Sequence, residues 1–134
     1  MKLRSFAVVL FLLSASSIGA QKSPPRVYDV IVSCTCTDTV GKSYARSLRD
    51  LIANSPRYNE LTDSKDNEKR ALLISVVTLP LGDDSDGTAR GAAISVVFII
   101  DGTYLSQYVQ TCGDDASVCA QKTFDSLDSL INTP

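Results

Sequence analysis

ALLISVVTL at Ala71–Leu79 and AAISVVFII at Ala92–Ile100 are the two runs of sequence that decide the fold. Each run is short, mostly apolar and rich in β-branched residues, which is typical of a strand buried on both faces of a sheet. Asp101-Gly102 follows the second run directly, and this dipeptide favours a tight hairpin turn. Tyr104–Cys112 is therefore predicted to return as an antiparallel strand beside Ala92–Ile100.

The chain before these runs predicts a strand followed by a helix. Val27–Cys34 (VYDVIVSC) is rich in β-branched residues and indicates a first strand. Thr37-Asp38-Thr39 offers candidates for a helix N-cap, and Ser55-Pro56 ends the helix because proline disfavours helical backbone in the residue before it. The apolar stripe of this helix has the spacing of one buried face and consists of Tyr44, Ala45, Leu48, Leu51 and Ile52. Arg57–Leu61 is either a short strand or an extended turn.

A second helix is predicted at the end of the chain, after the break at Gly113-Asp114-Asp115. Its apolar side consists of Ala116, Ala120, Phe124, Leu127, Leu130 and Ile131. The helix between the first two main strands favours a right-handed parallel crossover, whereas the later strands form hairpins. The sequence thus predicts an α+β fold, a two-layer sandwich in which two amphipathic helices pack on one face of a mixed, four- to five-stranded sheet. The other face is expected to be partly apolar.

The N-terminus has the three parts of a secretory signal peptide. Lys2 and Arg4 give a positive start, Phe6–Leu13 is apolar, and small residues lead to Ala20. The apolar run is too short to cross a bilayer, which takes roughly 20 residues. We expect residues 1–20 to be a signal peptide cleaved near Ala20, 21–26 an extended leader and 27–134 a single α/β domain. The mature protein is then secreted or periplasmic and has no stable membrane span.

The composition argues against several classes of function. The formal net charge is −2, and loss of Lys2 and Arg4 with the signal peptide makes the chain more acidic. The sequence shows no basic patch, which argues against nucleic acid as a partner. The chain has no histidine, the commonest general base and metal ligand. We therefore expect a protein that is not an enzyme and that uses no cofactor.

Four cysteines, Cys34, Cys36, Cys112 and Cys119, favour disulfides in an exported chain. Cys112 and Cys119 flank the last junction between strand and helix, so that closing this short loop is plausible. Cys34 and Cys36 lie two apart on a strand end, where their Cα atoms would be near the upper limit of about 7 Å for a disulfide. A pairing between the two halves of the chain is also open. The alternative is a thiol-redox or soft-metal site that uses Cys34 and Cys36.

Two motifs come close to ligand-binding signatures. Cys36-Thr-Asp-Thr-Val-Gly41-Lys42-Ser43 departs from a phosphate-binding loop only at its first position, where Cys36 replaces glycine. The Cβ of Cys36 opposes the tight backbone turn that surrounds a phosphate. The alternative interpretation is that Gly41 and Lys42 simply lie in the first turns of a helix. Asp83-Asp84-Ser85-Asp86-Gly87 is similar to a calcium loop but has glycine at 82, where an acid is needed, and it lacks a downstream glutamate. We interpret it as a solvated loop.

Val27–Leu79 resembles the N-terminal α/β domain of the TolB family. The residues that carry the resemblance are a strand, then Ala45, Leu48 and Ile52 on a helix, then Ser55-Pro56-Arg57-Tyr58, then a buried strand. The segment is also similar to the curli-secretion and penicillin-binding-protein-activator lipoproteins of that architecture. The resemblance implies a non-enzymatic part of an envelope assembly. The chain departs from the pattern in its four cysteines and in having no propeller after the domain.

Two hypotheses of function follow. In the first, the chain is a non-catalytic exported domain that binds another envelope or secreted protein through a sheet face or edge near Tyr104, Tyr108 and Val109, by strand addition or apolar packing. In the second, it is a thiol-redox or metal-handling protein that uses Cys34 and Cys36. A third hypothesis is nucleotide binding through Gly41–Ser43.

Overall fold

The structure is a computed structural model that describes residues 27–61, 71–82 and 90–132. The expected signal peptide and leader lie outside the described residues, as do residues 62–70 and the calcium-like segment 83–87. None of the described helices has the length and apolar character needed to cross a membrane.

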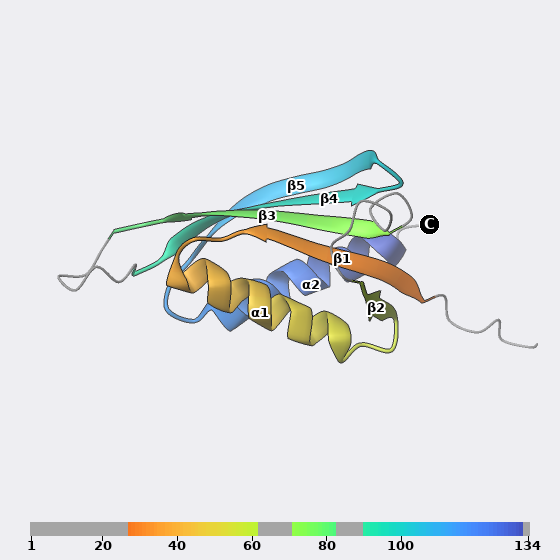
Figure 1. The fold of residues 1–134 in the computed structure, drawn as a ribbon, viewed down its shortest axis with the longest axis horizontal. Helices are drawn as coiled ribbons and strands as arrows, with labels where there is room; N and C mark the ends of the chain where they lie inside the picture. Colours follow the sequence, from red (N-terminus) through yellow and green to blue (C-terminus); the bar gives the residue numbers. More distant parts are fainter. Residues whose placement is uncertain (1–26, 62–70, 83–89, 133–134) are drawn as a thin grey trace, which may run out of the picture.

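Five strands and two helices make up the described part of the chain (Figure 1). They are β1 (Tyr28–Thr35), α1 (Thr39–Ala53), β2 (Tyr58–Glu60), β3 (Leu72–Pro80), β4 (Ala92–Ile100), β5 (Thr103–Cys112) and α2 (Ala116–Asn132). The sheet has the order β2-β1-β3-β4-β5. β1 is parallel to β2 and β3, and β4 is antiparallel to β3 and β5. This is the predicted mixed sheet, with the short strand of Arg57–Leu61 present as β2.

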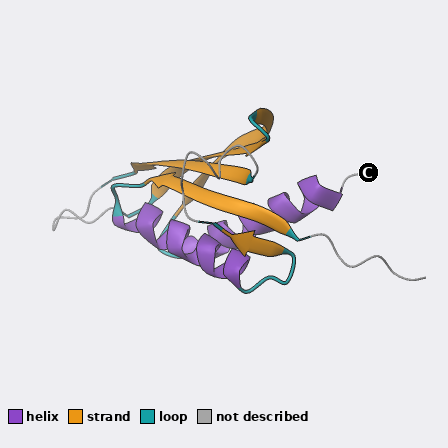
Figure 2. Cartoon of the chain, turned by 45° about the vertical axis from the view of Figure 1, so that its right-hand side comes forward, coloured by secondary structure: helices purple, strands orange, loops and turns teal. Residues whose placement is uncertain are grey.

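Both helices pack side by side on the same face of the sheet (Figures 1 and 2). The core lies between the two layers because one residue in two along each central strand faces the helices. The largest fully buried side chains of this core are Tyr44, Phe98, Leu48, Ile52, Leu72, Ile74, Ile94 and Leu127. The arrangement is the two-layer sandwich that the helix stripes predict.

Helix α1 begins where the sequence places an N-cap. The carboxylate of Asp38 accepts the backbone N–H of Gly41 at 2.6 Å, and its other oxygen accepts the hydroxyl of Thr78 on β3. The cap thus satisfies a helix donor and ties the helix to the sheet. Gly41 allows this close approach, since a Cβ there would lie 2.3 Å from Thr78 Oγ1. The helix ends at Ala53, just before Pro56.

The hairpin between β4 and β5 turns at Asp101-Gly102, as predicted. Asp101 has φ 49° and Gly102 has φ 73°, so that both lie in the left-handed region that two-residue hairpin turns of this kind require. Just beyond the turn the pairing slips by one residue, because Phe98 faces Ser106 while Ile99 faces Tyr104. Leu105 is therefore an extra residue on β5, which is a β-bulge.

The prediction that Ala71–Leu79 is buried on both faces is wrong. The side chains of β3 alternate between buried and half-buried or exposed, and Val77 and Leu79 are exposed. The reason lies in the packing: both described helices cover the same face of the sheet, and no described helix or strand lies over the other.

Candidate binding surface

Over β3, β4 and β5, the side of the sheet away from the helices carries no charged side chain of these strands; we call this part of the sheet the open face. The strand register places on it Leu73, Ser75, Val77 and Leu79 of β3, Ala93, Ser95, Val97 and Ile99 of β4, and Tyr104, Gln107, Val109 and Thr111 of β5. β3, β4 and β5 contain no Asp, Glu, Lys or Arg at any position. The open face over these three strands therefore offers apolar, hydroxyl and amide groups to a partner and no ion pair.

Several large side chains on the open face are accessible to solvent. The exposed fraction is 71% for Val109, 64% for Leu79 and 45% for Val77. Val77 and Val109 lie in one row across the sheet, because both pair with Ser95 of β4. Fully burying a side chain of this size stabilises a complex by roughly 1.5–3 kcal/mol. Several large apolar side chains exposed on one face of a sheet are typical of an interaction site.

Strand β5 adds an unpaired edge to this surface. Among the described strands, β5 pairs only with β4, so that one side of a ten-residue strand has no neighbour. Natural edge strands are commonly protected by charged side chains or proline, and β5 has neither. Its protection is limited to the bulge at Leu105, which leaves the stretch from Ser106 to Cys112 in regular pairing with β4. The outer edge of this stretch, which pairs with no described strand, can accept an added strand.

The structure separates the three residues of the predicted partner surface. Tyr104 and Val109 lie on the open face, and Tyr104 is 57% exposed. Tyr108 lies on the helix side, where its hydroxyl donates to Thr123 Oγ1 of α2 at 2.5 Å. Burial raises the pKa of the Tyr108 hydroxyl above its ordinary value. Tyr108 thus belongs to the core packing, and the candidate surface keeps Tyr104 and Val109.

Thr123 is the centre of a buried hydrogen-bond network between β5 and both helices. Its hydroxyl lies 2.6 Å from the hydroxyl of Tyr44 and donates to the carbonyl of Cys119 at 3.2 Å. The Gln110 amide also donates to Thr123 Oγ1, at 3.2 Å. Burial raises the pKa of the Tyr44 hydroxyl, so that the phenol stays neutral. A neutral, satisfied network of this kind supports a structural role.

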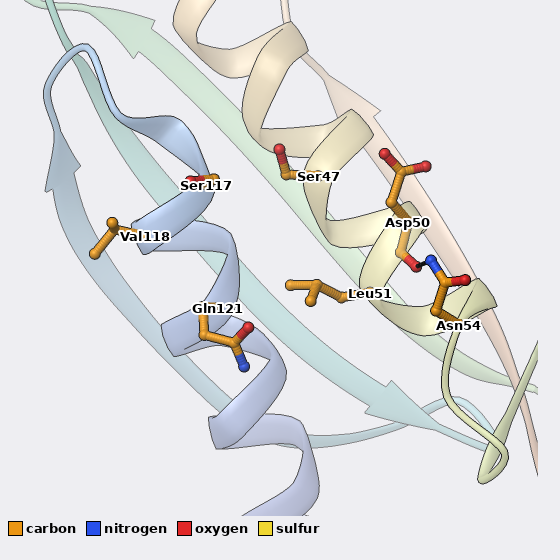
Figure 3. Close-up of a pocket in the computed structure, with 7 residues that line it drawn as sticks. All are labelled: Ser47, Asp50, Leu51, Asn54, Ser117, Val118 and Gln121. Carbon is orange, nitrogen blue, oxygen red and sulfur yellow. Dashed lines mark hydrogen bonds between the residues drawn. The ribbon is translucent and has the colours of Figure 1, made fainter.

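A groove lies between α1 and α2 on the helix layer (Figure 3). Ser47 and Leu51 of α1 face Ser117 and Gln121 of α2 across it. Its volume is about 390 Å³, and Asp50 is its only ionisable lining residue. A lone carboxylate among hydroxyl, amide and apolar groups gives no pair of acid and base and no activated nucleophile. The groove therefore carries no reaction chemistry of its own.

Comparisons with known proteins add little to this geometry. No protein-family model matches the chain, and no curated protein matches its sequence. Among solved structures, the chain is similar to the uncharacterized lipoprotein B from Nitrosomonas europaea at 13% sequence identity, over 77% of this chain and 72% of the other. The TM-score of 0.31 is too low for this similarity to support a conclusion. The resemblance of Val27–Leu79 to the TolB N-terminal domain stays a prediction.

Gly41 of the nucleotide-like motif has a structural role. Gly41 lies inside α1, and the backbone N–H that a phosphate loop would direct to its ligand is donated to Asp38. Lys42 lies on the exposed side of the helix. Among the described residues, no group of three or more His, Cys, Asp or Glu side chains is placed to hold a metal ion.

All four cysteines are joined in disulfides. Cys112 and Cys119 bridge the junction of β5 and α2 with their Cα atoms 6.1 Å apart, and both are buried. Cys34 and Cys36 pair with each other, with a Cα separation of 5.3 Å. The expected separation near 7 Å is wrong because β1 ends at Thr35, so that Cys36 lies beyond the extended strand. The shorter distance is within the ordinary range for a disulfide.

Proposed function

We propose that this chain is an exported, non-catalytic domain that binds another envelope or secreted protein through the open face and the β5 edge. The observation that carries the proposal is a mismatch between sequence and packing. β3 and β4 have the continuous apolar sequence of strands covered on both faces, yet the described helices cover only one. A partner that covers the second face supplies the burial for which these side chains are suited.

The character of the surface indicates the chemistry of the partner. The open face over β3, β4 and β5 has no charge to pair with phosphates or with an acidic or basic protein surface. An extended segment with few charges fits best: its backbone pairs with β5, and alternate apolar side chains pack against Val77 and Val109. The expected signal peptide and the two disulfides support a location outside the reducing cytoplasm.

Two exposed valines on opposite layers provide a matched test. Val109 is 71% exposed on the open face, and Val118 is 51% exposed on α2. We expect mature protein with Val109→Glu to capture its partner from the exported fraction at least about tenfold more weakly than the wild type, because the new charge is desolvated in the complex. Val118→Glu should capture the same protein as the wild type. Equal capture by both variants and the wild type would remove the open face as the binding site.

A further inference from the structure

A cleft beside strand β1 brings the Cys34–Cys36 disulfide next to cationic side chains. β2 pairs with β1 only at Tyr28–Val30, so among the described strands the β1 edge beyond these residues has no neighbour on that side. Arg49 of α1 covers part of this edge, because its guanidinium donates to the Val32 carbonyl at 2.9 Å. The remaining hollow has a volume of about 550 Å³ and is lined by Cys34, Cys36, Lys42, Ala45, Arg46, Arg49, Asp50 and Glu60.

The charges in this cleft favour an anion beside the sulfurs. Arg49 is paired with Glu60 at 3.5 Å, and Asp50 is the other carboxylate of the lining. Lys42 and Arg46 lie one helical turn apart on α1, and neither is in an ion pair within the part of the chain that the structure describes. Lys42 also acts over a longer range on Asp38, whose carboxylate is already bound by Gly41 and Thr78. Among its described ion pairs, the lining thus leaves one ammonium and one guanidinium group against one carboxylate, in the same cleft as the disulfide.

The two disulfides of the protein differ sharply in access. Cys112 and Cys119 are 3% and 6% exposed and pack within the core, whereas Cys34 and Cys36 are half-buried and open to the cleft. A thiolate must reach a disulfide sulfur in line with the S–S bond to exchange with it, so accessibility selects the Cys34–Cys36 pair. The pair also closes a ring over a single intervening residue, Thr35.

We propose that Cys34–Cys36 is an exchangeable disulfide that oxidises a dithiol of another exported protein. One thiolate of the substrate attacks a sulfur of the pair, the Cys34–Cys36 bond breaks, and a mixed disulfide forms while the other cysteine leaves as a thiolate. The second substrate thiolate then attacks the mixed disulfide and releases the second cysteine. The substrate gains one disulfide, and Cys34 and Cys36 gain the two electrons and, from solvent, two protons.

Lys42 and Arg46 supply the driving force for this transfer. A disulfide becomes more oxidising when its reduced form is stabilised, and a nearby positive charge stabilises the leaving thiolate. Glu60 is neutralised by Arg49, which limits the opposing effect of the carboxylates. The activity is separate from binding at the open face, which lies on the other side of the sheet from α1.

The test compares the two disulfides of the wild-type mature protein in dithiothreitol buffers of graded redox ratio. Free thiols are trapped with N-ethylmaleimide, and peptide mass spectrometry reads each pair separately. We expect half-reduction of Cys34–Cys36 at a ratio at least about tenfold more oxidising than for Cys112–Cys119. Lys42→Gln/Arg46→Gln should shift the midpoint of Cys34–Cys36 about fivefold toward more reducing buffers, and Lys122→Gln on α2 should leave it unchanged.

A transfer assay completes the test with a reduced peptide that contains two cysteines. The wild type should convert about one equivalent of peptide to its disulfide, and Cys34→Ala/Cys36→Ala should convert none. Reduction of both disulfides at the same ratio would overturn the proposal, and so would a peptide that stays reduced. These two readings use the wild type and therefore decide the matter even where a charge variant is poorly folded.

Discussion

Gly41 shows how one missing methyl group positions a helix on a sheet. An added Cβ would lie 2.3 Å from Oγ1 and 2.7 Å from Cγ2 of Thr78, so rotation of Thr78 cannot relieve both contacts. We expect Gly41→Ala to lower the free energy of unfolding by about 1–3 kcal/mol, although alanine favours helix more than glycine does. Urea denaturation measures the change. Gly113→Ala, where a Cβ meets nothing within 4 Å, should change it by less than about 0.5 kcal/mol.

Asp38 makes part of the stability depend on pH. Burial opposes its ionisation, but the hydrogen bonds from Thr78 and Gly41 outweigh this and hold the pKa of the carboxyl below its ordinary value of 3.8. Its contribution is therefore present above that value and is lost as the pH falls through the lowered pKa. We expect Asp38→Asn to cost about 1 kcal/mol at neutral pH and progressively less in acid.

Urea denaturation of the wild type and of Asp38→Asn between about pH 7 and pH 3 measures the contribution of the Asp38 carboxylate. The contribution at each pH is the difference between the free energies of unfolding of the two proteins. Asp114→Asn, which removes an exposed carboxylate in the loop before α2, is the control. A gap between wild type and Asp38→Asn that stays constant over the whole range would contradict the assigned role of Asp38.

In the β4–β5 hairpin, the sequence predicts the turn but not the bulge in β5. Asp101-Gly102 predicts the hairpin correctly, because its turn type is fixed by local backbone conformation. Tyr104 and Tyr108, four residues apart, share a face in any regular strand, but the extra residue Leu105 moves them to opposite faces. Nothing in the sequence YLSQYVQTC marks this position, since a bulge without glycine depends on the pairing with β4.

The cationic side chains beside the Cys34–Cys36 disulfide could have been predicted from the sequence. Lys42, Arg46 and Arg49 have helical spacing and follow Cys34 and Cys36 at once, so they project from one side of the helix beside the end of the first strand. The N-cap, the helix end and both helix stripes were also predictable from local signals. The contact of Gly41 with Thr78 was not, because it joins residues that are far apart in the chain.

At the level of elements, the two disulfides should differ in their effect on stability. Cys112–Cys119 spans seven positions and Cys34–Cys36 spans two, and the loop-closure entropy of the unfolded chain grows with this separation. We expect Cys112→Ala/Cys119→Ala to lower the free energy of unfolding by about 3 kcal/mol and Cys34→Ala/Cys36→Ala by about 1.5 kcal/mol. Denaturation of the oxidised variants in urea measures both. Equal losses of stability would contradict the expected dependence on loop length. A larger loss for Cys34→Ala/Cys36→Ala would show that Cys34–Cys36 is the main structural bridge.

The whole molecule is a sandwich of two layers. The sequence of its central strands is as apolar as that of a sheet covered by a layer on each face. Helices α1 and α2 bury one face, and the open face displays Val77, Leu79 and Val109 beside the unpaired edge of β5. We thus propose separate places for two tasks: the open face for a protein partner and the Cys34–Cys36 cleft for thiol exchange. Sequence alone predicted the two layers and a partly apolar second face, but not that Val77 and Leu79 are exposed on that face. A continuous apolar strand has the same sequence pattern whether its second face is covered by its own chain or by a partner.

Crosslinking from single positions in cells tests the central claim, that a partner covers the open face, most directly. A photoreactive amino acid replaces Val109 on the open face or Val118 on α2, and the crosslinked products are identified by mass spectrometry. We expect one discrete exported partner to be crosslinked from position 109, with little or no product from position 118. No product from position 109, or the same partner crosslinked more strongly from position 118, would contradict the account.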